Sequence, residues 1–294
     1  MTLTVGTLAT VCFALLAMGY VLFLILGRVP SKAKAISAVW PVLWIETLIV
    51  AVVAGALWLG GWVLVAVLIA HAFRTAWEAA HVATKRAELT PPLIYAANIV
   101  FLSILLSFAP LSIVAPLTAA AFLACLLLRR LASDERARVA LDLTLFPGIP
   151  LILFTAVGLQ GDQSAWFLLA FMLVEVFDSY ALVGGKLFGR TKAFPTLSPN
   201  KTVEGLACGA AILMLTAAIG AAIFGASIGG AILLAAFIAP FAVAGDLAAS
   251  RLKRLSFVKD FPKFLPHQGG LLDTTDAWIA VVAALVVASQ IFTG

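Results

Sequence analysis

The sequence predicts an all-α, polytopic integral membrane protein with about ten transmembrane helices. Of its 294 residues, 63% are hydrophobic and only 11% are charged, whereas a soluble domain carries about 25% charged residues. Apolar runs of about 20 residues, the length that crosses a bilayer, also recur along the whole chain. A soluble fold could not cover so much apolar surface.

The predicted spans follow one another with short connections. Gly60 and Gly61 alone separate the second from the third, and Pro110 alone separates the fourth from the fifth. The first span is long and lacks a small-residue cleavage site, so we expect a membrane anchor rather than a removed signal peptide. The predicted spans are 4–27, 37–59, 61–80, 92–109, 111–129, 139–158, 164–185, 205–225, 229–249 and 270–292.

The lysines and arginines define an orientation for these spans. All 19 lie in, or directly beside, the odd-numbered connections, and the even-numbered connections and both termini have none. The positive-inside rule therefore predicts cytoplasmic odd connections and two extracytoplasmic termini. A bacterial inner membrane is the expected location. The net charge of +5 does not indicate a nucleic-acid partner, because the cations are spread over short loops.

Acidic side chains gather near the cytoplasmic ends of the last four spans. An acid in or beside a membrane span is costly, so each one marks a candidate functional site. For any single acid, an ion pair with a neighbouring cation is an equally good explanation. Three of the acids flank one connection, which favours a Mg²⁺ site. The gathered acids are Glu175, Asp178, Glu204, Asp246, Asp273 and Asp276, the three at the connection are Asp246, Asp273 and Asp276, and the more scattered acids are Glu46, Glu78 and Asp142.

The connection from Ser250 to Asp276 is the most informative part of the sequence. It carries five cations and ends in two aspartates that open the last span. Cations can bind phosphate groups, and carboxylates can bind the Mg²⁺ that phosphate chemistry uses. The five cations are Arg251, Lys253, Arg254, Lys259 and Lys263.

A second polar connection, Gly184–Gly205, contains four glycines, two prolines and four cations. Glycine allows close backbone approach, and Ser198, Thr202 and backbone N–H groups at the start of the next span can bind phosphate oxygens. The residue spacing of a P-loop is absent. An ordinary positively charged cytoplasmic loop is the alternative interpretation.

At these two connections the sequence resembles the CDP-diacylglycerol synthase (phosphatidate cytidylyltransferase) family. The resemblance is specific over about 178–276 and weak before it. The family's C-terminal signature and its upstream G-D-L are matched in register by Ser250, Lys253, Arg254, Lys259, Asp260, Phe261, Pro266, Gly269, Gly270, Asp273 and Asp276, and by Gly245, Asp246 and Leu247. Its other motifs are matched by Asp178, Gly185, Phe188, Gly189, Ser198, Pro199, Lys201, Thr202, Glu204 and Gly205.

The sequence departs from this family pattern at four positions. Ala249 stands in place of a glutamate, Gln268 of a histidine, Thr274 of an arginine and Leu182 of a tyrosine. The aspartates of the signature and its Lys-Arg pair are kept. We therefore expect metal-dependent nucleotidyl transfer to be retained, with a change in the lipid acceptor or in efficiency.

The resemblance implies transfer of a cytidylyl group from CTP to a lipid phosphate, with phosphatidic acid giving CDP-diacylglycerol and pyrophosphate. It implies one or two Mg²⁺ ions on Asp246, Asp273 and Asp276, in a cytoplasm-facing active site among the last four spans. A monovalent ion and a homodimer are left open. Residues 161–294 then form the catalytic transmembrane region, and residues 1–160, with about six spans, form a lipid-facing scaffold.

The same resemblance assigns the other site residues. Lys201, Ser198 and Thr202 would hold the nucleotide phosphates, and cations of the basic connection would hold the lipid phosphate or pyrophosphate. The implied catalytic residues are Asp246, Asp273, Lys253, Arg254 and Lys259. The implied substrate-binding residues are Ser198, Pro199, Lys201, Thr202, Glu204, Asp178, Gly269 and Gly270.

Three alternatives stay open at this point. A related CTP-dependent enzyme could act on a polyprenol or its phosphate, as a kinase or a cytidylyltransferase, and the altered segment 267–274 favours this idea. A transporter could use intramembrane acids to relay ions, although it would place them near the bilayer midplane in separated halves. A degenerate paralogue could bind lipid without catalysis.

Overall fold

A computed structural model describes residues 4–28, 30–161, 163–264 and 269–293 of the chain. These residues form eleven α-helices, one π-helical segment and a two-stranded hairpin. The elements are α1 (Val5–Gly27), α2 (Pro30–Leu59), α3 (Gly61–Ala83), α4 (Pro92–Ser107), α5 (Leu111–Leu131), α6 (Glu135–Leu143), η1 (Thr144–Gly148), α7 (Ile149–Gln160), α8 (Ser164–Phe188), β1 (Lys192–Phe194), β2 (Ser198–Thr202), α9 (Val203–Phe224), α10 (Ile228–Leu255) and α11 (Leu271–Thr293).

Each predicted span corresponds to a helix, except that the sixth is divided into α6, η1 and α7. The division falls at Phe146, whose φ of −153° and ψ of 128° are not helical. Phe146 precedes Pro147, and a proline disfavours helical geometry in the residue before it. By length and composition, seven segments of the described residues can cross a membrane, and three apolar helices are shorter. The chain is therefore a multi-pass integral membrane protein, as predicted.

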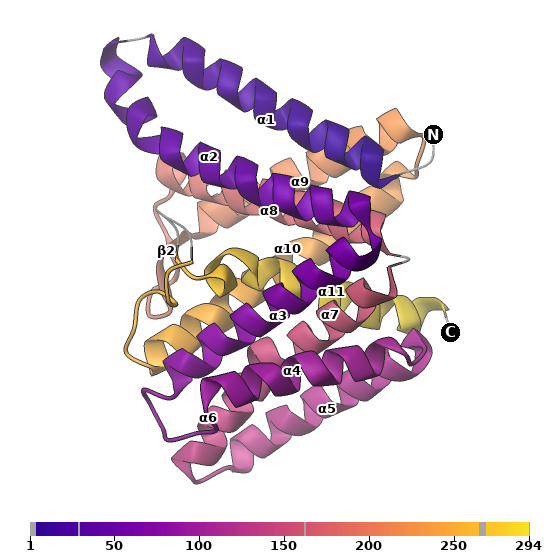
Figure 1. The fold of residues 1–294 in the computed structure, drawn as a ribbon. Helices are drawn as coiled ribbons and strands as arrows, with labels where there is room; N and C mark the ends of the chain where they lie inside the picture. The colour runs from indigo at the N-terminus through magenta and orange to yellow at the C-terminus, as the bar shows by residue number, and fades with distance from the viewer. Residues whose placement is uncertain (1–3, 29, 162, 265–268, 294) are drawn as a thin grey trace.

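Helix α11 runs through the centre of the molecule. α1 and α2 lie side by side at one end, and α4, α5 and α6 lie at the other (Figure 1). Between them, α11 contacts α3, α5, α7, α8 and α10. The Trp278 ring of α11 packs against Phe154 and Phe171, with ring centroids 4.7 and 5.1 Å apart, and its indole N–H donates to the backbone oxygen of Phe167 at 3.2 Å. Helices from both halves of the chain thus surround α11.

Glycines bring α9 close to α8. A Cβ at Gly205 would lie 2.6 Å from the backbone oxygen of Ala181, and a Cβ at Gly209 would lie 2.7 Å from that of Phe177. Small residues let membrane helices approach closely in this way. α9 therefore begins beside the C-terminal half of α8, which carries Asp178.

The connection between α8 and α9 contains a β-hairpin that the sequence did not predict. β1 and β2 are antiparallel, with Lys192 opposite Thr202 and Phe194 opposite Ser198. Thr202 ends β2 and caps α9, because its hydroxyl accepts the backbone N–H of Gly205 at 3.1 Å. Apart from this hairpin, the described residues form the all-α fold that was predicted.

Candidate active site

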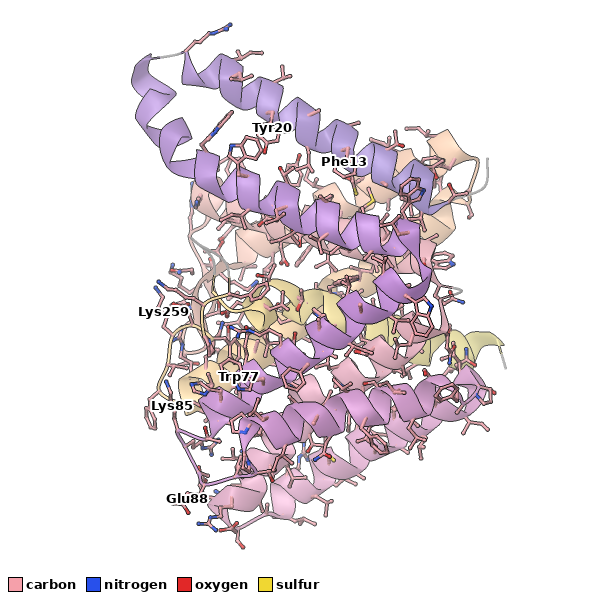
Figure 2. All side chains as sticks on the ribbon, in the orientation of Figure 1. Phe13, Tyr20, Trp77, Lys85, Glu88 and Lys259 are labelled. Carbon is pink, nitrogen blue, oxygen red and sulfur yellow. The ribbon has the colours of Figure 1, made fainter. Side chains whose placement is uncertain are left out.

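The two polar connections, the hairpin and the segment between α10 and α11, lie on the same side of the molecule (Figure 1). Lys85, Glu88 and Lys259 lie along this side as well (Figure 2). Lys85 and Glu88 belong to the third connection and Lys259 to the ninth, so the structure places these two odd-numbered connections on the same side as the hairpin of the seventh. The positive-inside rule, rather than the structure, assigns that side to the cytoplasm.

Lys201 of β2 links the two connections. Its Nζ lies 3.5 Å from Oδ2 of Asp246 on α10, which is too long for a good hydrogen bond. That oxygen is buried and has no hydrogen-bond partner among the described residues. Asp178 of α8 and Asp276 of α11 lie near enough to Asp246 for electrostatic interaction. Three carboxylates from three helices therefore form one group beside a lysine.

This group offers ligands for Mg²⁺ without being a complete metal site. Within the part of the chain that the structure describes, no three His, Cys, Asp or Glu side chains are close enough to hold a metal ion. Mg²⁺ binds proteins through one or two carboxylates and completes its shell with water and phosphate oxygens. Oδ2 of Asp246, which pairs with Lys201 but accepts no hydrogen bond in the described chain, fits that pattern together with the nearby Asp276.

Asp273 differs from Asp246 because the protein itself engages both of its oxygens. Oδ2 accepts the backbone N–H groups of Phe261 at 3.0 Å and of Gly270 at 2.8 Å, and Oδ1 forms an ion pair with Lys253. A Cβ at Gly269 would lie 2.8 Å from Cγ of Asp273, so a glycine there makes room for the carboxylate. Asp273 thus organises the start of α11, and its binding of a metal stays a prediction.

The other cations of the basic connection fall into two groups. Arg254 and Lys259 are exposed and make no ion pair within the described residues. Both are therefore available to an incoming phosphate. Arg251 instead pairs with Asp142 of α6, with 3.4 Å between Nη2 and Oδ1.

The hairpin residues have local contacts that explain part of their pattern. Glu204 accepts the backbone N–H groups of Arg190 at 3.0 Å and of Thr191 at 3.1 Å, and Thr202 caps α9. These contacts stabilise the hairpin against the start of α9. Contact of Ser198, Pro199, Thr202 or Glu204 with a substrate stays a prediction.

Three of the four departures from the family pattern, Ala249, Gln268 and Thr274, belong to the motifs around the basic connection, and the structure describes two of them. Ala249 is completely buried in α10. Thr274 lies in the first turn of α11, and its hydroxyl is 3.4 Å from the backbone oxygen of Gly270. Gln268, together with His267 and Pro266, lies outside the described residues.

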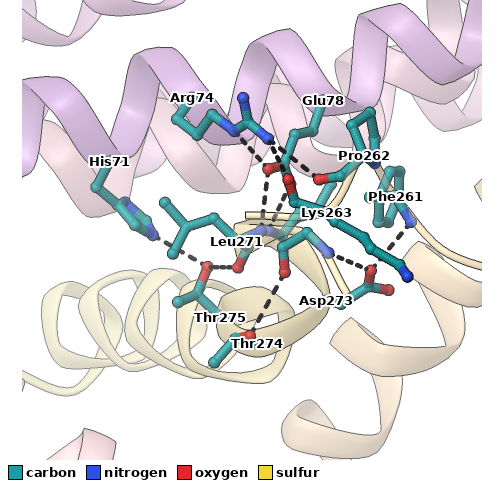
Figure 3. Close-up of polar contacts among 12 residues, drawn as sticks. His71, Arg74, Glu78, Phe261, Pro262, Lys263, Leu271, Asp273, Thr274 and Thr275 are labelled. Atoms are coloured by element: carbon teal, nitrogen blue, oxygen red, sulfur yellow. Dashed lines mark hydrogen bonds and ion pairs between the residues drawn. The ribbon is translucent and has the colours of Figure 1, made fainter. Parts of the chain in front are cut away.

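The sequence analysis kept Glu78 of α3 as a candidate but did not connect it with this site. Grouped with the scattered acids, it in fact lies at the start of α11, where it accepts the backbone N–H groups of Leu271 and Leu272 (Figure 3). One signal in the sequence could have marked it. An acid inside an apolar span, four residues after Arg74, indicates an ion pair on one helix face. Ionisable residues within a membrane span are candidates for a functional site.

The fold and the site together define a class: a multi-pass helical membrane protein whose grouped carboxylates and exposed cations, on one side of the helices, suit a phosphate-bearing ligand. The chain belongs to the cytidylyltransferase family, whose sequence model matches residues 41–292. This match confirms the family resemblance found at 178–276 and extends it to the N-terminal helices.

Curated relatives named phosphatidate cytidylyltransferase share part of the sequence. A Helicobacter pylori protein is 38% identical over 140 residues, which are 46% of this chain and 50% of the relative. A Staphylococcus haemolyticus protein is 32% identical over 142 residues, or 48% and 54% of the two chains. A Bacillus subtilis protein is 40% identical over 110 residues, or 37% and 41%. The chain thus spans about half the length of the curated relatives it matches.

Proposed function

We propose that this protein transfers the cytidylyl group of CTP to the phosphate of phosphatidate, which forms CDP-diacylglycerol and releases pyrophosphate. The observation that carries the proposal is the 3.5 Å approach of Lys201 to Asp246. It brings the motif of the hairpin and the motif of α10 into one site. The family membership and the names of the relatives support the reaction and this acceptor.

The reaction needs a lipid phosphate and a nucleotide triphosphate to meet at headgroup depth. A phosphate oxygen of the lipid attacks the α-phosphorus of CTP. A new P–O bond forms as the bond from the α-phosphorus to the bridging oxygen breaks, and the electron pair leaves with pyrophosphate. A polar site at the ends of membrane helices suits this meeting, because the lipid phosphate lies at that depth and CTP arrives from water.

Cations of the two connections would position these groups. Lys201, with Ser198 and Thr202, would hold the phosphates of CTP. The exposed Arg254 and Lys259 would hold the lipid phosphate or the pyrophosphate, and the guanidinium fork makes Arg254 the more directional of the two.

Lys253 has a separate role in this proposal. Its ion pair with Asp273 fixes a positive charge that also interacts with Asp276. A charge fixed in advance can stabilise a transition state with little reorganisation.

We propose that Asp246 and Asp276 are the main ligands of Mg²⁺. When bound, Mg²⁺ would neutralise charge on the transferring phosphoryl group and on pyrophosphate. Asp246 suits this role because one of its oxygens is buried without a hydrogen-bond partner in the described chain. Asp273 could join them only by releasing an oxygen from Lys253 or from the backbone N–H groups that it accepts.

A second candidate acceptor is a polyprenol, which carries no phosphate. Thr274, in the first turn of α11, is the observation that favours it. The position carries an arginine in the resembled family, and an arginine could bind a phosphate through two parallel hydrogen bonds. The hydroxyl of threonine cannot replace that interaction.

Product analysis tests the proposal directly. Purified protein is incubated with labelled CTP, Mg²⁺ and, in separate reactions, phosphatidate, polyprenyl phosphate, polyprenol and diacylglycerol. We expect CDP-diacylglycerol and pyrophosphate from phosphatidate alone. CDP with a phosphorylated alcohol would instead show a lipid kinase, and the absence of any lipid product would favour a binding protein or a transporter.

We also propose that the site faces the cytoplasm and that both termini lie outside. The distribution of lysines and arginines supports this orientation. Introduced cysteines at 226–228 and at 256–264 can be labelled in intact cells with a membrane-impermeant reagent. Labelling of the second segment from outside would contradict both the orientation and access of CTP to the site.

A further inference from the structure

Three residues along α3 reach the start of α11 or the connection that leads into it, although the two helices are far apart in the sequence. His71, Arg74 and Glu78 are spaced three and four residues apart and so share one helix face. Nε2 of His71 lies 3.0 Å from the hydroxyl of Thr275. Figure 3 shows Arg74 and Glu78 meeting the connection that leads into α11. α3 therefore contributes to the proposed site from the part of the chain predicted to be scaffold.

Glu78 acts as the N-terminal cap of α11. Its side chain is completely buried, and its two oxygens accept the backbone N–H groups of Leu271 at 3.0 Å and of Leu272 at 2.9 Å. The first N–H groups of a helix need acceptors from outside the helix. A side chain just before the helix usually supplies one, but that residue here is Gly270. A carboxylate at this end also interacts favourably with the helix dipole.

Gly270 is a glycine because Glu78 occupies the space that a larger residue would need. A Cβ at position 270 would lie 2.8 Å from Cδ of Glu78 and 2.6 Å from Cβ of Phe261. Both distances are shorter than real Cβ atoms allow. The packing of a carboxylate from α3 thus explains this glycine of the family signature without a contact to substrate.

Arg74 joins the same carboxylate to the basic connection. Its Nε donates to Oε1 of Glu78 at 2.7 Å, and its Nη2 donates to the backbone oxygens of Pro262 at 3.1 Å and of Lys263 at 3.4 Å. The guanidinium also lies 4.7 Å from the ring centroid of Trp77. A buried carboxylate needs this kind of compensation from a cation and hydrogen bonds.

We propose that Glu78, assisted by Arg74, is a positioning residue of the active site. Through Leu271 and Leu272 it fixes the first turn of α11, which carries Asp273. Asp273 in turn holds Lys253, and Asp276 lies one turn further on. The inference rests on the proposed function for its effect on catalysis, while its structural part can be measured without any substrate.

Substitution of Glu78 tests the catalytic effect. Glu78→Gln keeps the size of the side chain but replaces one of the two acceptor oxygens by an NH₂ group. We expect kcat to fall by about 100-fold, because a displacement of about 1 Å at a reacting group has this consequence. The KM for CTP should change by less than about threefold. Glu78→Asp keeps the charge but is shorter by one methylene, so it should not restore kcat.

The matched control is Asp142→Asn, which neutralises another buried carboxylate that also contacts arginines. It should lower thermal stability and leave the kcat of the folded enzyme within about threefold of the wild type. A Glu78→Gln enzyme that is folded and has the kcat of the control would overturn the proposal.

Trypsin cleavage after Lys263 provides a test that does not depend on enzymatic activity and that leaves Glu78 unchanged. In the wild type, Arg74 donates to the carbonyl oxygen of Lys263, whose peptide bond to Phe264 is the one that trypsin cleaves, and to the carbonyl oxygen of Pro262 before it. Cleavage at the Lys263–Phe264 bond therefore reports local opening. Arg74→Lys should accelerate cleavage at this bond at least about fivefold, whereas Asp142→Asn should not. Equal rates in both variants would contradict the role of Arg74 and Glu78, even if the wild type proved inactive with CTP and all lipids. An inactive wild type with accelerated cleavage would refute the proposed function alone.

Discussion

Glu78 and Asp142 are both buried carboxylates in the first half of the chain, and they are held in different ways. Asp142 contacts three arginine side chains: Arg129 at 2.8 Å, and Arg86 and Arg251 at 3.4 Å each. Glu78 contacts one arginine side chain and two backbone N–H groups of α11. Side-chain ion pairs join helices but allow them to shift, whereas hydrogen bonds to the backbone fix where a helix begins. Both acids stabilise the fold, and only Glu78 sets the geometry of the site.

The two ends of the basic connection show the same difference. α10 is closed by its own backbone: the N–H groups of Phe257 and Val258 donate to the carbonyls of Arg254 and Lys253 at 3.2 and 3.0 Å, the pattern of a Schellman cap. The first N–H groups of α11 are instead capped by a side chain from α3, that of Glu78. The position of Lys253 is therefore set locally, while that of Asp273 depends on a distant part of the sequence.

The largest expected effect comes from two carboxylates of the proposed site, which the comparison separates from Asp142. Asp246→Asn and Asp273→Asn should each reduce product formation by a factor on the order of 10³ while leaving the protein inserted and folded. The first weakens a proposed ligand of the Mg²⁺ that neutralises phosphate charge, and the second removes the partner that fixes Lys253. Initial rates with CTP and phosphatidate measure this. Turnover near the wild-type rate in either variant would remove that residue from the chemistry.

Asp142→Asn should lower the stability of the protein and leave its kcat nearly unchanged, whereas Glu78→Gln should lower kcat. Loss of the charge leaves three arginines without their shared partner, and we expect the free energy of unfolding to fall by about 2 kcal/mol. Thermal unfolding in detergent, followed by circular dichroism, measures this change. The distinction between the two acids would collapse if Asp142→Asn lowered kcat as strongly as Glu78→Gln.

A moderate effect is expected at the departures from the family pattern. Restoring both residues as Gln268→His with Thr274→Arg should raise activity on phosphatidate relative to polyprenol by about tenfold, because a charge-assisted pair of hydrogen bonds to the lipid phosphate is gained. The dependence on Mg²⁺ concentration should stay nearly unchanged. A shift in that dependence with a fixed lipid preference would assign both positions to metal binding instead.

The smallest expected effect concerns the end of α10. Phe257 has a φ of +56° and is 92% exposed, so it occupies the left-handed position of the cap, which favours glycine, and it loses little packing when replaced. Phe257→Gly should raise the free energy of unfolding by about 1 kcal/mol. Lower stability in this variant would show that the ring contributes contacts, and the local account of this cap would be wrong.

The membrane helices could be predicted because length and apolar composition determine them almost alone. The hairpin could not, because Ser198–Thr202 is short, contains Pro199 and has no alternating apolar pattern. Asp273 and Asp276 were expected to share one helix face at a metal. Asp273 lies in the first turn of α11, as that spacing predicts, and its binding of a metal stays a prediction. The spacing does not reveal that its carboxylate also accepts the N–H group of Gly270.

Glu78 illustrates what sequence spacing cannot provide. The pair Arg74 and Glu78 is visible as a helical ion pair, but its contact with Leu271 joins residues 193 positions apart. Such a contact depends on how α3 packs against α11. The residue types of the proposed site were therefore predictable, while the element that holds them in place was not.

Hydrogen exchange at the start of α11 tests the central claim most directly. The exchange rates of the backbone N–H groups of Leu271 and Leu272 can be followed by mass spectrometry of overlapping peptides in the wild type, Glu78→Gln and Asp142→Asn. We predict exchange about 10- to 100-fold faster at these two groups in Glu78→Gln, because hydrogen bonds to a charged acceptor are lost, and no change in Asp142→Asn. Equal protection in all three proteins would contradict the claim that Glu78 fixes the start of α11.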